Sequence, residues 1–353
     1  MYEYGHGGNY AFEKGKEGFI DLSASINPLG MPEGVRDAII REICNCGSYP
    51  DNSSAELRNK LSQFENVSAD RVFCGGGASD IIFRLPGAIR AKKVMVAAPT
   101  FSDYERSALS FGSEVVRCAL SPSDGFSAGE SFVGEVRRTK PDLVFICNPN
   151  NPTGNLTGTG VIGELLDCCK GFGAYVAVDE CFLDFAERAV DYTSKPFLEQ
   201  YSNLVIIKAF TKMFALPGIR LGYAICGGEE LPGKLSYNGA DWPVSNLAQA
   251  AGMASLDGAG EFISKTVDYV SAERALMEQR LSGFGFEVYE SAANFVFLRN
   301  PFPTDLNTML GKKSIQVRSC RNFFGLDGDY YRIAVSTKEN NAKLLAAVSE
   351  AMK

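Results

Sequence analysis

Four short runs of the chain are almost continuously apolar: residues 93–99, 142–147, 174–178 and 203–207. Strands without polar alternation are typical of a sheet that is covered on both faces and is usually parallel. The stretch 160–173, between two of these runs, has the apolar spacing of a helix and ends in a glycine suited to a C-cap. This alternation of strands and helices predicts an open α/β sheet.

The pattern changes in the last third of the chain. There, stretches with helical spacing enclose shorter apolar stretches that are typical of strands. In order, these stretches are residues 261–285, 286–299, 315–320, 330–336 and 338–353. They predict a smaller α+β domain. We expect a large domain over residues 41–235 and a small domain over residues 236–353, to which an N-terminal arm, residues 1–40, also contributes.

Composition narrows the class of protein. The chain has 353 residues, of which 45% are hydrophobic and 22% charged, and its net charge is −7. These values are typical of a soluble globular protein, and the negative charge without a basic stripe argues against a nucleic-acid partner. The N-terminus has no signal-peptide pattern, and no apolar run approaches the roughly 20 residues that span a bilayer. We expect a cytoplasmic protein with neither nucleic-acid nor membrane partners.

Cysteine and histidine usage limits the possible chemistry. None of the ten cysteines forms a C-x-x-C motif, and Cys74, Cys147, Cys181 and Cys226 lie in apolar stretches. We interpret these four as reduced, buried thiols. The chain has a single histidine, His6, so a multi-histidine metal site is excluded and a Ser-His-Asp hydrolase would have to use that residue. No metal site is predicted.

Polar residues follow the apolar strands at the points where the strands end. Asn151, Asp179 and Lys212 come after three of them, and Arg220 follows Lys212 across a Pro-Gly break. A glycine-rich turn, residues 74–82, leads into a helix whose first N–H groups could bind a phosphate. Ligands gather outside the carboxyl ends of such strands. Pyridoxal phosphate needs this set: a lysine for a Schiff base, an anion for its pyridine nitrogen, donors for its ring oxygen and a cradle for its phosphate.

Each of these signals has a simpler explanation when it is taken alone. Asp179 could cap a strand end, and the segment NPNNPTG, residues 148–154, could be an ordinary turn cluster. Lys208 is a rival amine, but we predict it to be solvated because Lys212, not Lys208, has the Pro-Gly-x-Arg sequence after it. The prediction of a cofactor site therefore depends on the order and joint occurrence of the elements.

Three motifs, NPNNPTG, the Asp-Glu pair at Asp179 and FTKMFALPGIRLGY, together resemble the class I/II aminotransferases of the fold-type-I pyridoxal-phosphate superfamily. The resemblance covers nearly the whole chain and implies that fold, with pyridoxal 5'-phosphate as cofactor. It implies that Lys212 forms the Schiff base, that Asp179 pairs with the pyridinium nitrogen and that Asn151 donates to the ring oxygen. The residues that it implies for the cofactor phosphate are Ala78, through its backbone N–H, Ser79, Thr211 and Arg220.

The same resemblance implies three further contacts. Phe101 would stack on the face of the cofactor ring. Tyr49 would reach the cofactor phosphate of a neighbouring subunit, which implies a homodimer. Arg332 would bind the substrate carboxylate through two parallel hydrogen bonds.

Segments outside this shared core resemble a narrower group. Residues 6–30, 241–252 and 317–335 are similar to threonine-phosphate decarboxylases, relatives of the histidinol-phosphate aminotransferases. Phe182 stands where the aminotransferases usually have a tyrosine that donates to the ring oxygen, and Ala209 stands where the family often has a serine. In that group the N-terminal segment approaches the substrate phosphate. The residues that this resemblance implies for the substrate phosphate are His6 and Arg318, with Arg321 a weaker candidate.

These resemblances imply an enzyme that decarboxylates L-threonine O-3-phosphate to 1-amino-2-propanol O-2-phosphate, used for the side arm of cobalamin. The alternative enzyme is an aminotransferase for histidinol phosphate or a related amino acid, because both reactions use the same core. A regulator or binding protein that kept the fold is a third possibility. The intact set of Lys212, Asp179, Asn151, Arg220 and Arg332 argues against the third, since a binding protein needs no covalent bond to the cofactor.

Overall fold

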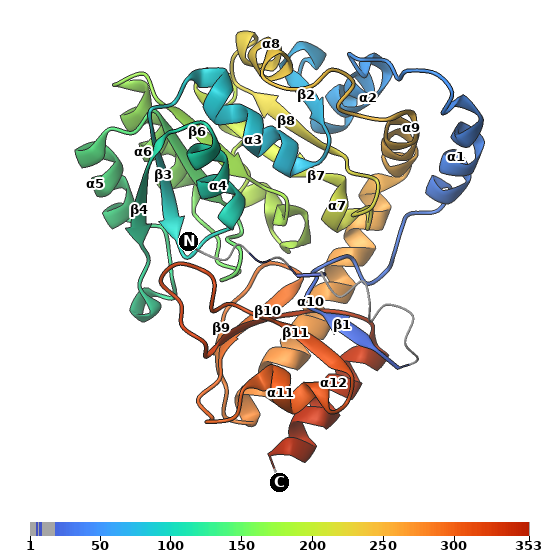
Figure 1. Ribbon diagram of the computed structural model, residues 1–353, viewed down its shortest axis with the longest axis vertical. Coiled ribbons are helices and arrows are strands. Elements are labelled where there is room, and N and C mark those ends of the chain that lie inside the picture. The colour runs from blue at the N-terminus through green and yellow to red at the C-terminus, as the bar shows by residue number, and fades with distance from the viewer. Residues whose placement is uncertain (1–4, 6, 9–17, 353) are drawn as a thin grey trace.

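The computed structural model describes residues 5, 7–8 and 18–352, and in this part of the chain the strands form two separate sheets (Figure 1). The larger sheet contains, in spatial order, β2 (Val72–Gly75), β8 (Gly222–Cys226), β7 (Leu204–Ala209), β6 (Tyr175–Asp179), β5 (Leu143–Cys147), β3 (Lys93–Ala98) and β4 (Glu114–Ala119). The five strands β3 to β7 are all parallel to one another. Strand β8 is antiparallel to both of its neighbours, β2 and β7. The predicted α/β fold with a mostly parallel sheet is confirmed.

Helices cover both faces of the larger sheet, which explains why its central strands lack polar alternation. In β6, Ala177 packs on one face while Val176 and Val178 pack on the other. The first of these faces is covered by α3 (Ala78–Ile89), α4 (Ser102–Ser110) and α8 (Glu230–Tyr237). The opposite face is covered by α2 (Ala55–Glu65), α5 (Glu130–Thr139) and α6 (Thr159–Lys170).

The smaller sheet contains, in spatial order, β1 (Ile20–Leu22), β11 (Ile315–Ser319), β12 (Tyr330–Ala334), β10 (Phe295–Arg299) and β9 (Glu287–Tyr289). β1 is parallel to β11, with Ile20 opposite Ile315, and the other pairs are antiparallel. The N-terminal part of the chain thus joins a sheet built otherwise from the last third. The helices that pack here are α10 (Ala259–Gly283), α11 (Leu306–Gly311) and α12 (Lys338–Ala351). The domain boundaries at residues 40/41 and 235/236 stay predictions.

The remaining helices lie between the elements already named. The other α-helices of the described chain are α1 (Val35–Glu42), α7 (Phe210–Met213) and α9 (Asn246–Ser255). Short 3₁₀ helices occupy residues 43–45, 69–71, 122–124, 183–185, 189–191 and 195–197. Helix α9 packs against α1 and α2, so this segment beyond residue 235 lies beside helices that precede the larger sheet.

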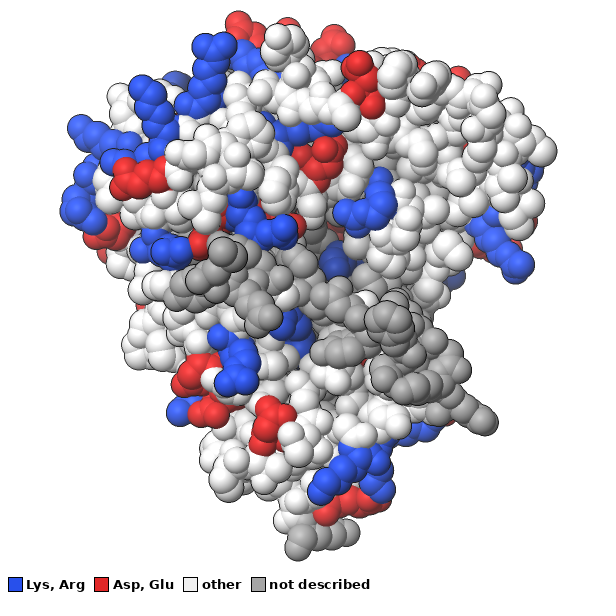
Figure 2. Space-filling model, in the orientation of Figure 1, with Lys and Arg blue, Asp and Glu red and all other residues white. Residues whose placement is uncertain are grey.

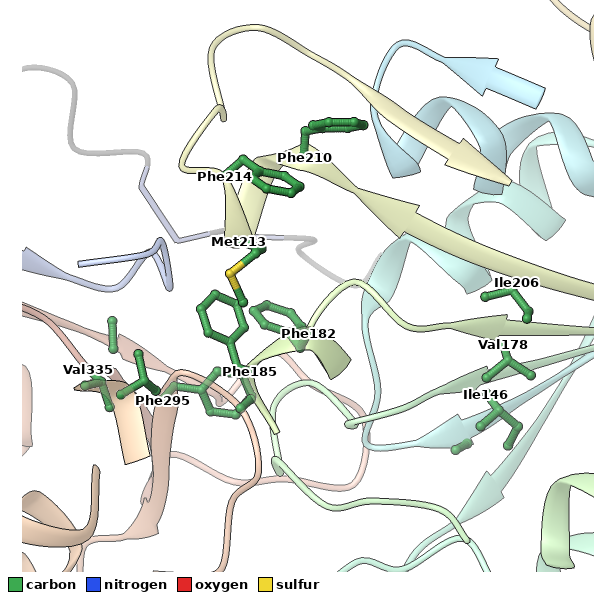
Figure 3. Packing of buried hydrophobic residues seen from close by; sticks show 14 of the residues in the cluster. Ile146, Val178, Phe182, Phe185, Ile206, Phe210, Met213, Phe214, Phe295 and Val335 are labelled. Carbon is green, nitrogen blue, oxygen red and sulfur yellow. The ribbon is translucent and has the colours of Figure 1, made fainter. Parts of the chain in front are cut away.

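One hydrophobic core runs from the larger sheet into the smaller one. Val178 of β6 and Ile206 of β7 lie at its larger-sheet end, and Val335 lies just beyond β12 at the other end (Figure 3). Between them, the buried rings of Phe182 and Phe295 meet edge to face with their centroids 5.4 Å apart. Because such packing leaves little room for relative movement, it fixes how the smaller sheet sits at the ends of the parallel strands.

The prediction that Lys208 is solvated is wrong, because the residue is only 7% exposed. Its Nζ lies 2.9 Å from Oδ1 of Asp184 and 3.3 Å from Oε1 of Glu65. Burial alone would lower the pKa of Lys208, but these carboxylates raise it well above its ordinary value. Burial would likewise raise the pKa of Glu65, but Lys208 and Lys195 hold it at about 2. Lys208 is therefore the centre of a buried ion-pair cluster.

The cysteines are free thiols, and three of the four singled out from the sequence are buried as expected. These are Cys74, Cys147 and Cys226. Cys181 is only half-buried, because it borders a cavity at the end of β6.

Charged side chains of both signs are interspersed on the face seen in Figure 2, where they form no continuous basic stripe. In the described part of the chain, no helix has the length and apolar character needed to cross a membrane.

Candidate active site

A cavity of about 240 Å³ lies where the carboxyl ends of β5, β6 and β7 meet the smaller sheet. The predicted site residues that line this cavity are Ala78, Ser79, Phe101, Asn151, Asp179, Thr211, Lys212, Arg220, Arg318 and Arg332. Asn151, Asp179 and Lys212 meet here because the carboxyl ends of parallel strands share one edge of a sheet, whereas Arg318 and Arg332 come from the smaller sheet. Phe182 and Ala209, the two departures from the family pattern, border the same cavity.

Lys212 lies on the short helix α7, directly after β7. The backbone N–H of Asn27 donates to the carbonyl of Lys212 at 3.1 Å, and its side-chain amide donates to the carbonyl of Met213 at 2.7 Å. The Nζ of Lys212 lies 5.4 Å from the ring centroid of Phe182. Burial, followed by the charge of Arg332, lowers the pKa of Lys212 to about 8. The amine is thus held in a fixed turn and gives up its proton more readily than an ordinary lysine.

Asp179 is the last residue of β6 and is 5% exposed. Its Oδ2 accepts a hydrogen bond from the hydroxyl of Tyr104 at 2.7 Å, and its Oδ1 accepts from the backbone N–H of Cys181 at 3.0 Å. Burial raises the pKa of Asp179 above its ordinary value, and these donors oppose that effect. The carboxylate is therefore buried, oriented and hydrogen-bonded at the cavity wall.

The start of α3 and the side chain of Arg220 approach each other closely. A Cβ at Gly77, whose φ is +95°, would lie 2.8 Å from a guanidinium nitrogen of Arg220. A Cβ at Gly222 would lie 2.5 Å from the backbone nitrogen of Ala78. Only glycine fits at these two positions, so the chain can bring an arginine and the N–H groups of a helix start to one place. That combination of donors suits a phosphate.

The hydroxyl of Ser79 is already engaged in this region. It donates to Oδ2 of Asp103 at 2.9 Å, and Oδ1 of that buried carboxylate accepts from Arg106, also at 2.9 Å. In this arrangement the Ser79 hydroxyl proton points to Asp103, which leaves the backbone N–H groups, Thr211 and Arg220 as the predicted donors for an anion.

Arg332 lies on β12 and is 7% exposed. Its Nη1 donates to Oδ1 of Asn151, and its Nη2 donates to the carbonyl of Ser23 at 2.9 Å. Its buried Nε has no hydrogen-bond partner among the described residues. Burial lowers the pKa of Arg332 to about 10. A buried cation with an unused donor is suited to an anionic group that enters the cavity.

Arg318 lies on the neighbouring strand β11, where it is paired with Arg332. Its guanidinium donates to Oδ1 of Asn322 at 2.7 Å and to the carbonyl of Gly5. Gly5 of the N-terminal arm therefore lies beside the second arginine of the cavity. His6 lies outside the described residues.

Two other predicted residues are placed elsewhere. Tyr49 is 79% exposed, and its ring stacks on Trp242 with centroids 4.4 Å apart. Arg321 is exposed, and neither of these residues is among those found to line the cavity in the described part of the chain.

Sequence reasoning missed several residues at the cavity. The clearest are Asp103 and Tyr104, which contact Ser79 and Asp179, together with Cys181 and Asn322. Asp103 and Tyr104 lie two and three residues after Phe101, in the first turn of α4, so the sequence indicated this segment but not these contacts. No pattern within α4 indicates which residues lie opposite it.

Comparison with known proteins agrees with this fold and site. The family model for aminotransferase class I and II matches residues 17–348. The chain is 30% identical to the threonine-phosphate decarboxylase of Salmonella typhimurium, over 99% of this chain and 96% of the relative. It is 34% identical to the histidinol-phosphate aminotransferase of Bacillus subtilis, over 96% and 93% of the two chains. The structure matches the histidinol-phosphate aminotransferase from Clostridium acetobutylicum with a TM-score of 0.87 and 29% identity, over 94% and 99% of the chains.

The chain therefore belongs to the class I and II aminotransferase family, whose members have the fold-type-I architecture and depend on pyridoxal phosphate. The cavity fits that cofactor. Lys212 offers an amine, Asp179 an oriented carboxylate, and the start of α3 with Arg220 a set of anion donors. Among the described residues, no group of three His, Cys, Asp or Glu side chains is placed to hold a metal ion.

Proposed function

We propose that the protein decarboxylates L-threonine O-3-phosphate, with release of 1-amino-2-propanol O-2-phosphate. The observation that carries this proposal is the pairing of Arg318 and Arg332 on adjacent strands, both at the cavity. Paired residues of antiparallel strands lie about 5 Å apart at their Cα atoms. Two cations at this spacing suit a short substrate with a carboxylate on one carbon and a phosphate on the next.

The positions of the cavity residues support the roles proposed for them. Lys212 would bond the cofactor covalently, Asp179 would pair with its pyridine nitrogen and Asn151 would donate to its ring oxygen. Phe101 stacks on its ring. Its phosphate would be bound by the backbone N–H of Ala78, by Ser79, by Thr211 and by the guanidinium of Arg220. Bound in this way, the cofactor supplies an electron sink for the bond that breaks at Cα.

The chain selects which bond at Cα breaks through the way it holds the substrate. Arg332 holds the carboxylate through a charge-assisted pair, and Arg318, with His6 and the arm, holds the phosphate. The Cα–carboxylate bond breaks, carbon dioxide leaves, and a proton is added to Cα. Lys212 is placed to carry that proton, because its pKa of about 8 lets it gain and lose protons near neutral pH.

A second candidate is transamination of histidinol phosphate, because the Bacillus subtilis aminotransferase is 34% identical to the chain. In that case Lys212 would move a proton away from Cα instead of adding one. Histidinol phosphate has a phosphate but no carboxylate, so it would use only one of the two arginines at a time. The absence of a hydroxyl on Phe182 also favours the decarboxylase.

We also propose that the protein acts as a homodimer. The side chains of Ile40, Ile43 and Tyr49 are each more than half exposed, and Trp242 beside Tyr49 is 42% exposed. A monomer would leave this apolar surface in water, whereas a second copy could cover it and receive Tyr49 at its cofactor phosphate. Light scattering should give the mass of a dimer, and Tyr49→Ala should weaken cofactor binding; a monomeric, fully active enzyme would contradict this proposal.

Deuterium labelling tests the proposed reaction. With L-threonine O-3-phosphate in D₂O, decarboxylation should give an amino alcohol phosphate with one non-exchangeable deuterium on the carbon that lost the carboxylate. Mass spectrometry of the product measures this label. A phosphorylated 2-oxo acid as the main product would instead indicate transamination.

A further inference from the structure

The carboxylate of Asp179 accepts from the thiol of Cys181 and from two further uncharged donors that differ in origin. The backbone N–H of Cys181 donates to Oδ1 at 3.0 Å, and this donor would be available with any residue except proline at position 181. The hydroxyl of Tyr104 donates to Oδ2 at 2.7 Å from α4, 75 residues away in the chain. The second donor therefore depends on one particular side chain.

Packing holds the ring of Tyr104 in one position, with its hydroxyl between Asp179 and the thiol of Cys147. The residue is 0% exposed. Its ring stacks on Phe145 of β5, with centroids 4.9 Å apart and planes inclined by 12°. Its ring also meets Phe101 edge to face at 5.7 Å. Since the ring is packed on both neighbours, the bond to Asp179 is pre-formed and costs little further side-chain entropy.

The tyrosine and the two thiols beside this carboxylate stay uncharged. Burial, followed by the charge of Asp179, raises the pKa of Tyr104 well above its ordinary value. Burial also raises the pKa of the thiols of Cys147 and Cys181, which border the same carboxylate. Among the groups that perturb Asp179, Lys212 is the cation, and its charge favours the ionised carboxylate. A hydrogen bond from a neutral hydroxyl stabilises the negative charge without cancelling it.

We propose that Tyr104 is a positioning residue that keeps Asp179 ionised and directed into the cavity, and thereby maintains the proton on the cofactor's pyridine nitrogen. The inference rests on the proposed pairing of Asp179 with that nitrogen. Each carboxylate oxygen has two acceptor positions, and the bonds from Tyr104 and Cys181 use one on each. The thiol of Cys181 uses a third position, which leaves one for the cofactor. Tyr104 also touches Phe101, so it supports both the predicted ring-stacking residue and the predicted nitrogen partner.

The substitution Tyr104→Phe tests this role in the holoenzyme, because it removes the hydroxyl and keeps the ring. Two quantities are measured besides activity: the pH midpoint of the bound cofactor's visible absorption band and the cofactor's dissociation constant. The midpoint should rise by about half to one pH unit, because a ring with less positive charge holds the titrating proton more tightly. The dissociation constant should rise about tenfold, and kcat should fall about tenfold with KM changed less than about twofold.

Tyr201→Phe is the matched control. Its hydroxyl donates to Oδ1 of Asp167 at 2.8 Å, a bond of the same kind outside the cavity lining. This variant should keep the wild-type midpoint, dissociation constant and kcat. Asp179→Asn tests the pairing of Asp179 with the cofactor by itself, apart from the role of Tyr104. This variant should shift the midpoint further than Tyr104→Phe does. No shift in Asp179→Asn would reject the pairing.

A second substitution covers the case in which Tyr104→Phe folds poorly. With 3-fluorotyrosine at position 104, the ring is nearly unchanged in size but the hydroxyl is a stronger donor. The midpoint should then move to lower pH, opposite to the effect of Tyr104→Phe. A midpoint that stays at the wild-type value in either folded variant, while Asp179→Asn shifts it, would overturn the inference.

Discussion

Arg318 of β11 and Arg332 of β12 are directly paired across two antiparallel strands, and both line the cavity at the ends of the parallel strands. Arg332 is buried and bonded to Asn151 and Ser23, whereas Arg318 is bonded to Asn322 and to the N-terminal arm. The two cations therefore have separate supports. A substrate with two anions on adjacent carbons can engage both at once.

Arg318→Gln should weaken binding of the substrate phosphate without weakening binding of the substrate carboxylate. We expect KM for L-threonine O-3-phosphate to rise about thirtyfold, since a charge-assisted bond is lost, while KM for unphosphorylated L-threonine changes little. Steady-state assays with both substrates measure this difference. Arg321→Gln is the control, because that side chain is exposed and does not line the described cavity. Equal changes for the two substrates in Arg318→Gln would remove Arg318 from the phosphate site.

Lys212→Ala should abolish the visible absorption band of the covalently bound cofactor and reduce kcat by more than about a thousandfold. Lys208→Met should keep the band, because the amine of Lys208 is buried in the ion-pair cluster with Glu65 and Asp184. Absorption spectra of the two purified variants decide between the lysines. A band that persists in Lys212→Ala would show that another amine holds the cofactor.

Glu65→Gln should lower the free energy of unfolding by about 3 kcal/mol at pH 7, because it leaves a buried ammonium with one partner fewer. The pKa of Glu65 is about 2 in the folded chain and 4.5 ordinarily, so the stabilisation is complete above pH 4.5 and declines as the pH falls towards 2. Urea unfolding at several pH values measures the difference between wild type and variant.

Glu199→Gln is the control for that experiment. Its carboxylate pairs with Arg71 at 2.6 Å, but the side chain is 81% exposed. The loss should be below about 1 kcal/mol and should fall with added salt. A difference between wild type and Glu65→Gln that does not shrink in acid would contradict the ion-pair account of Lys208.

Gly7→Ala should disturb the arm without unfolding the protein. A Cβ at Gly7 would lie 2.1 Å from the carbonyl oxygen of Ser23, which accepts the hydrogen bond from Arg332. The arm must move away, so we expect KM for the phosphorylated substrate to rise about tenfold, with the midpoint of thermal unfolding nearly unchanged. In the control Gly134→Ala on α5, a Cβ meets no atom within 4 Å, and KM should stay at the wild-type value. Normal KM in Gly7→Ala would separate the arm from the substrate site.

The site residues that follow the parallel strands could be predicted from the sequence, because each is marked by the apolar run directly before it. A continuous apolar run predicts a buried parallel strand, and the polar residue after it, such as Asp179, then falls at the ligand-binding edge. The short distance from β7 to Lys212 follows the same logic. Nothing comparable marks Tyr104, whose partner is 75 residues away and whose place on α4 looks like that of any core aromatic.

The burial of Lys208 could not be predicted from the sequence. A charged residue at the end of an apolar strand is normally exposed to solvent or takes part in catalysis. The sequence around Lys208 contains no sign of the carboxylates that pair with it. Glu65 at the end of α2 and Asp184 after β6 reach it only through the packing of helices on the sheet. Burial of a charge by distant partners is a property of the tertiary structure, so a single sequence could not predict it.

The most direct test of the proposed function compares two reactions of the purified, cofactor-loaded protein. One sample contains L-threonine O-3-phosphate and is assayed for carbon dioxide; the other contains histidinol phosphate with 2-oxoglutarate and is assayed for glutamate. We predict carbon dioxide from the first sample and no glutamate from the second. Glutamate without carbon dioxide would contradict the decarboxylase and would identify an aminotransferase built on the same cavity.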